Sequence, residues 1–105
     1  MYTYNQAKES VLRYINRSKK HISEESDLEC AIMEEQTIEK PYGWVFFYQS
    51  KQYLESDDIQ GLLVGNSPIL FEKDTGRMIS TGTGKDINYY LNLYEKGEWN
   101  VYAEG

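Results

Sequence analysis

A hydrophobic stripe near the amino terminus predicts the first helix. Small and apolar residues recur there at three- and four-residue spacing, with charged residues on the other faces. Thr3 and Gln6 have the spacing of a capping box, in which each side chain satisfies a backbone amide of the first turn. We therefore expect a helix from about Tyr4 to Lys19, followed by a polar loop from His21 to Asp27. The stripe consists of Ala7, Val11, Tyr14, Ile15 and Ser18.

After this loop the hydrophobic period changes to two, which predicts strands. Alternation from Leu28 to Met33 is typical of a half-buried strand, and Thr37–Lys40 could continue it after a bulge. Pro41–Gly43 predicts a bend. The continuous apolar run Trp44–Tyr48 is typical of a central strand that is covered on both faces. Together these segments predict an antiparallel pair.

The second half of the chain predicts a hairpin after an ambiguous link. Ser50–Leu63 is compatible with either a short helix or a turn, and this choice stays open. Ile69–Lys73 and Arg77–Thr81 flank Asp74-Thr75-Gly76, a turn in which the glycine takes the left-handed position.

A second helix and a tail follow the hairpin. Asp86 is a good N-cap, apolar residues from Ile87 to Tyr94 recur at helical spacing, and Gly97 ends the helix. The tail Glu98–Gly105 alternates as a short strand or a docking segment would.

The order of these elements predicts one α+β domain over residues 1–105. Its expected core is a four-stranded, largely antiparallel sheet, with an N-terminal and a C-terminal helix packed on one face. A chain of this length is too short for two ordinary domains.

Composition and charge narrow the range of possible functions. The chain has 11 basic and 17 acidic residues, a net charge of −6, whereas nucleic-acid binders cluster cations against phosphate. We therefore expect no nucleic-acid partner. One cysteine excludes an internal disulfide framework. The amino terminus lacks the pattern of a secretion signal, and no apolar run is long enough to span a membrane, so a cytoplasmic location without membrane contact is expected.

No motif predicts catalysis or a cofactor. In Thr81–Asp86 a P-loop would need a glycine where Ile79 stands and a hydroxyl residue where Asp86 stands, so a strand-to-helix turn is favoured. His21 and Cys30 are each the only residue of their kind, and a mid-strand cysteine is typically a small buried hydrophobe. The chain lacks the four Cys or His ligands of a structural zinc site. We expect no enzyme, no cofactor and no metal.

Two groups of residues are candidate partner contacts. Acidic residues could form a docking face for a basic protein, although a solvated acidic surface is the simpler interpretation. Aromatic residues of the tail are candidate interface anchors, and the alternative is that the tail closes the core. The candidates are Glu34, Glu35, Asp57, Asp58, Trp99 and Tyr102.

The segment Thr37–Ser50, with its run Lys40-Pro41-Tyr42-Gly43-Trp44-Val45-Phe46-Phe47-Tyr48, closely resembles the signature of the immunity protein 35 family, also called the YrhB-like domain. The likeness continues through Gly65-Asn66-Ser67-Pro68, the turn at Asp74-Thr75-Gly76, and Thr81-Gly82-Thr83.

This resemblance implies a small bacterial α+β domain of polymorphic toxin systems that binds and neutralises a cognate toxin. It supplies no catalytic residues. Two other functions remain open at this point. One is a chaperone-like module that covers apolar surface on client proteins, and the other is an enzyme that uses paired carboxylates in a pocket.

Overall fold

The first helix begins where its capping residues predict. The computed structural model describes residues 1–17, 29–57 and 66–98. Helix α1 (Tyr4–Ile15) starts after Thr3, whose Oγ1 accepts from the Gln6 amide at 3.1 Å while Gln6 Oε1 accepts from the Thr3 amide at 2.9 Å. The capping box is thus confirmed. The helix ends at Ile15, earlier than expected, and the predicted end at Lys19 lies outside the described residues.

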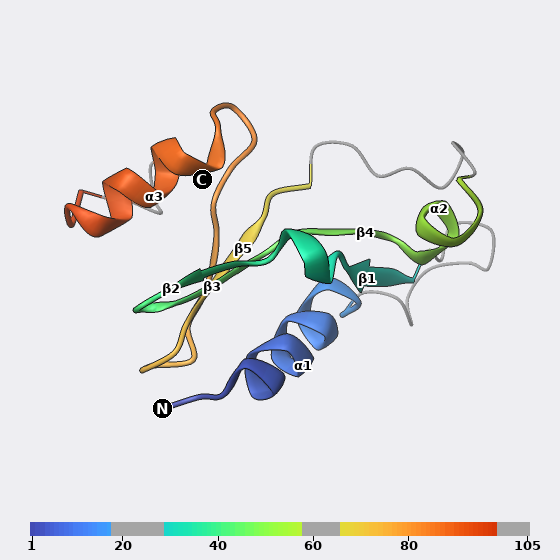
Figure 1. Ribbon diagram of the computed structural model, residues 1–105, viewed down its shortest axis with the longest axis horizontal. Helices are drawn as coiled ribbons and strands as arrows, with labels where there is room; N and C mark the ends of the chain where they lie inside the picture. The colour runs from blue at the N-terminus through green and yellow to red at the C-terminus, as the bar shows by residue number, and fades with distance from the viewer. Residues whose placement is uncertain (18–28, 58–65, 99–105) are drawn as a thin grey trace.

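Two antiparallel sheets follow α1 (Figure 1). The larger has the strand order β2-β3-β5-β6, and the smaller pairs β1 with β4. The α+β class, the four-stranded antiparallel sheet and the two terminal helices are confirmed. The elements are β1 (Cys30–Ile32), the 3-10 helix η3 (Glu34–Gln36), β2 (Ile38–Lys40), β3 (Gly43–Phe46), β4 (Tyr48–Ser50), α2 (Lys51–Ser56), β5 (Ile69–Glu72), β6 (Met78–Ser80) and α3 (Ile87–Glu95).

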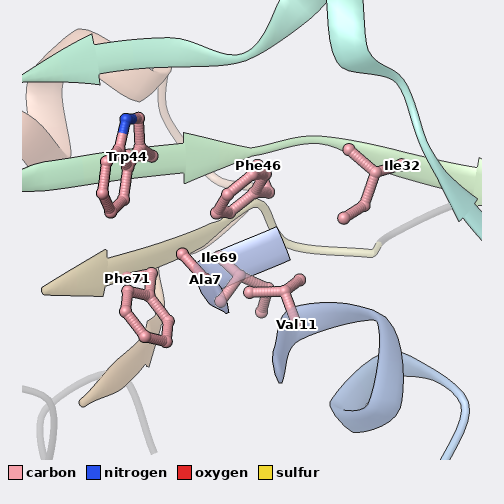
Figure 2. Packing of buried hydrophobic residues seen from close by; sticks show 7 residues of the cluster. All are labelled: Ala7, Val11, Ile32, Trp44, Phe46, Ile69 and Phe71. Atoms are coloured by element: carbon pink, nitrogen blue, oxygen red, sulfur yellow. The ribbon is translucent and has the colours of Figure 1, made fainter. Parts of the chain in front are cut away.

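The two terminal helices lie on opposite faces of the larger sheet. Trp44 and Phe46 of β3 pack with Ala7 and Val11 of α1, as Figure 2 shows. Val45, between them in the strand, packs on the other face with residues of α3. This corrects the expectation that both helices share one face. Because β3 is buried at every position, each of its faces needs its own cover.

The antiparallel pair predicted for the first four strands is confirmed. β2 and β3 pair around Pro41 and Tyr42, with Glu39 opposite Trp44. Farther from this turn the same two arms pair again as β1 and β4, after η3 interrupts the first arm between β1 and β2. In the ambiguous link, residues 51–56 form helix α2.

Two glycines next to β5 occupy positions that other residues would strain or crowd. Gly76 has φ +79°, which confirms the left-handed position predicted for the turn between β5 and β6. At Gly43, a Cβ atom would lie 1.9 Å from the carbonyl oxygen of Phe71 on β5. Any side chain there would therefore separate two strands of the core.

The last helix matches its prediction. Asp86 caps α3 by accepting from the Asn88 amide at 2.9 Å, and Gly97 follows the helix with φ +74°. Tyr90 and Leu91 are buried on the predicted stripe. None of the helices in the described part of the chain has the length and apolar character needed to cross a bilayer.

Candidate interaction surface

The predicted contact residues that lie in the described ranges, Glu34, Glu35 and Asp57, do not form one patch. Glu34 and Glu35 lie in η3, after the Ile32 end of β1, whereas Asp57 follows α2, beside the Cys30 end of that strand. The small sheet separates the two acidic groups, as the positions of η3 and α2 in Figure 1 indicate. Asp58, Trp99 and Tyr102 lie outside the described residues.

Glu34 joins η3 to α1 through its side chain. Lys8 Nζ lies 2.6 Å from Glu34 Oε2, and Tyr4 donates its hydroxyl to the other carboxylate oxygen at 3.5 Å. The hydrogen bond from Lys8 lowers the pKa of Glu34, and the same bond raises the pKa of Lys8. Glu34 therefore has a structural partner. Glu35 is exposed and pairs with no cation in the described ranges.

Asp57 terminates α2 in a left-handed conformation. Its φ is 55°, and its amide donates to the Tyr53 carbonyl at 2.8 Å. Asp is one of the residues that tolerate this conformation, so the backbone geometry at the end of α2 is sufficient to account for an aspartate at this position. Its carboxylate is exposed and accessible to a partner.

A polar network covers the sheet near the end of α3. Glu72 accepts hydrogen bonds from Tyr94, Thr75 and Arg77, and it forms an ion pair of 3.0 Å with Arg77. Burial raises the pKa of Glu72, but these donors outweigh burial and lower the pKa overall. Burial and the bond to Glu72 raise the pKa of Tyr94 to about 12.

Glu72 and Asp74 both line a hollow of about 170 Å³ beside this network. Catalysis by paired carboxylates requires environments that push their pKa values apart, so that the pKa of the proton donor is raised. The pKa of Glu72 moves downward instead, and its oxygens are engaged by three donors. The hollow therefore gives the carboxylate-enzyme hypothesis no support.

A wider hollow of about 480 Å³ lies between the glycine-rich loop and α3. Thr81 anchors the loop, since its amide and hydroxyl both donate to the Pro68 carbonyl, at 3.0 and 2.9 Å. The Lys85 amide donates to the Tyr90 hydroxyl at 3.1 Å, and the Asp86 carboxylate occupies the start of the helix. The loop is a strand-to-helix turn, as predicted, and its one carboxylate would repel a phosphate.

Tyr89 is the exposed aromatic residue of this hollow. The residue is 48% exposed, and Lys85 Nζ lies 5.7 Å from the centre of its ring. Sequence reasoning missed Tyr89 as a candidate contact. The signal was present, because Tyr89 falls off the buried stripe that contains Tyr90 and Leu91.

Of the two remaining candidates for chemistry, Cys30 and His21, the structure describes only Cys30. Cys30 is buried, and burial, with a smaller effect from Glu29, raises the pKa of its thiol. His21 lies outside the described residues. Within the described ranges, no group of three or more His, Cys, Asp or Glu side chains is arranged to hold a metal ion.

Comparison with known proteins supplies the family. The chain matches the family described as immunity protein 35 over residues 7–92. It is 40% identical over 53 residues to the uncharacterized protein YrhB of Escherichia coli strain K12, an alignment that covers 50% of this chain and 56% of YrhB. The chain thus spans about half the length of this curated relative. No solved structure matches it significantly. Because the match extends from the first helix into the last, this chain belongs to the immunity protein 35 family.

Proposed function

We propose that this protein binds a cognate protein toxin in the cytoplasm and neutralises it by covering its active site or substrate groove, without chemistry of its own. The observation that carries the proposal is the family match over residues 7–92. Neutralisation by binding requires a rigid, complementary surface and no reactive group.

The packing of the protein supports this mode of action. Two buried clusters, one on each face of the larger sheet, fix the positions of α1 and α3. Rigid surfaces lose little conformational entropy on binding, which favours tight complexes. The net charge of −6 would steer the protein toward a toxin with a basic surface. Glu35, Asp57, Lys85 and Tyr89 are exposed residues that could make contacts.

The chaperone-like alternative gains no support. A client-binding surface needs a contiguous apolar patch. The large apolar side chains that are most exposed in the described ranges are Met1 and Tyr2 at the amino terminus, Leu54 on α2 and Tyr89 on α3. Figure 1 places the amino terminus, α2 and α3 well apart from one another, so these side chains form no contiguous patch.

Co-expression with the toxin encoded beside this gene tests the proposal. The expected result is survival of the host and a purified complex of the two proteins, with an equally acidic unrelated protein as the control. Unchanged toxicity and no complex, at equal levels of folded protein, would contradict the proposal.

A further inference from the structure

The register of the larger sheet determines where the backbone groups of its edge strand point. In an antiparallel pair, successive residues direct their N–H and C=O groups alternately to the two sides of the strand. The Glu72 amide donates to the Arg77 carbonyl at 2.9 Å, and the Thr81 amide donates to the Pro68 carbonyl at 3.0 Å. With Leu70 opposite Ile79, these bonds place the groups of Arg77, Ile79 and Thr81 toward β5. The groups of Met78 and Ser80 therefore point outward, away from the sheet.

Other strand edges of this protein carry caps. By the same alternation, Cys30 of β1 points its backbone groups away from β4, since the Lys51 amide bonds to the Glu29 carbonyl. Asn16 meets them with its side-chain amide, which accepts from the Cys30 N–H at 2.8 Å and donates to the Cys30 C=O at 3.1 Å. The side chain of Ile32, the next outward residue of β1, packs in one buried cluster with Ala7 and Val11 of α1.

The outer side of β4 is capped in a similar way. Asn66 donates its side-chain amide to the Tyr48 carbonyl at 2.8 Å, and the Ser50 amide donates to Gln49 Oε1 at 2.9 Å. At the far edge of the larger sheet, the outward residue of β2 is Glu39, which is exposed and charged and lies two residues before Pro41. Charged residues and proline are common guards against unwanted strand pairing.

The outer edge of β6 has no such side-chain cap in the described part of the chain. No residue in the described ranges bonds to the outward backbone groups of Met78 and Ser80. Between Met78 and Ser80 the strand contains neither a charged residue nor a proline, and Ser80 is exposed. The nearest charged side chain, Arg77, directly precedes the strand and forms an ion pair with Glu72. β6 thus offers two outward N–H and C=O pairs, at the two-residue spacing that an added strand requires.

We propose that β6 is the docking edge of this protein, on which an extended segment of a basic partner protein adds a fifth strand to the larger sheet. The inference rests on the proposed function, and it names the surface that meets the toxin. A second copy of this chain could satisfy the same groups, because Met78 of one copy would pair with Ser80 of the other. Two copies would each carry a net charge of −6, so charge favours a basic partner over self-association.

Amide hydrogen exchange, followed by NMR on the whole protein, tests this placement. In the protein alone, the Ile79 amide should exchange slowly, since it bonds to β5, whereas the amides of Met78 and Ser80 should exchange quickly. In the complex with the toxin encoded beside this gene, the latter two should become slow. Protection of both in the protein alone, or only in a dimer of it, would overturn the inference.

A pair of proline variants provides the functional test. Ser80→Pro removes an outward donor and leaves the bonds between β5 and β6 intact, since the Ser80 amide points away from β5. The toxin complex should weaken by about tenfold or more. Glu39→Pro makes the same change on the other edge, since the Glu39 amide also points outward, and it should leave affinity unchanged.

The outcomes separate the two proposals. If the wild type binds the toxin, but Ser80→Pro binds equally well, the inference fails and the proposed function stands. If the wild type binds no toxin, the proposed function fails and the inference falls with it. If the thermal midpoint shows that Ser80→Pro does not fold, the docking edge is tested instead by the amide exchange rates of Met78 and Ser80 in the wild-type complex.

Discussion

Replacing Asn16 by alanine should cost a large part of the stability of this protein. The side chain makes three hydrogen bonds, from Nδ2 to the carbonyls of Leu12 and Cys30 at 3.0 and 3.1 Å, and from the Cys30 amide to Oδ1 at 2.8 Å. A net contribution of about 1 kcal/mol for each bond predicts a loss of about 3 kcal/mol. Domains of this size have a total stability of roughly 5–15 kcal/mol.

Urea unfolding of Asn16→Ala, followed by circular dichroism, measures this loss. Asn5 is exposed on the same helix, and Asn5→Ala should change stability by less than about 0.5 kcal/mol. Asn16→Asp keeps the acceptor for the Cys30 amide, but it places a second carboxylate oxygen against two carbonyls. It should therefore be at least as destabilising as alanine at neutral pH. A loss below about 0.5 kcal/mol for Asn16→Ala would refute the capping of β1 by this amide.

Three further predictions follow from the core and the polar network. Gly43→Ala should destabilise by about 3 kcal/mol or more, because its Cβ would meet the Phe71 carbonyl, whereas Gly84→Ala, with a contact of 3.6 Å, should be nearly neutral in the same unfolding assay. Because the pKa of Glu72 is lower in the folded than in the unfolded protein, its carboxylate stabilises the fold above pH 4.5, and this stabilisation is lost as the pH falls through the pKa of the folded state. The thermal midpoint should therefore fall in acid, and it should fall less for Glu72→Gln. Cys30 should react with a thiol reagent far more slowly in the native protein than in urea, and equal rates would contradict its burial.

Local patterns in the sequence predicted the elements that depend on neighbouring residues. The capping box at Thr3, the left-handed turn at Gly76 and the cap at Asp86 each involve residues at most a few positions apart. Their geometry follows from backbone sterics and nearby hydrogen bonds, which the sequence specifies directly.

Long-range arrangements could be predicted less well. The continuous apolar run of β3 indicated a strand covered on both faces, yet placing the two helices on opposite faces requires knowing that Val45 meets α3 while Trp44 meets α1. The hairpin of the first four strands was predicted, but the change of register across η3, which divides it into β1–β4 and β2–β3, was not. The bonds of Asn16 join residues 14 positions apart, and an asparagine after a helix carries no signal of its partner.

For the candidate surface, too, local features were predicted and long-range contacts were not. Glu35, Asp57 and the glycine-rich turn were identified from charge and turn residues, and all are exposed or lie at the surface. The pairing of Glu34 with Lys8 was not predicted, because residues 26 positions apart meet only when η3 lies beside α1. The open edge of β6 follows from strand register, which the sequence of the strand alone does not specify.

The most direct test of the central claim, that this protein acts by binding alone, is the stoichiometry of protection. A fixed amount of the proposed cognate toxin is titrated with this protein, and residual toxin activity is measured. Binding predicts that activity falls in proportion to the added protein and reaches zero near one molecule per toxin. Complete inactivation by a small fraction of an equivalent would show turnover, and it would contradict the claim.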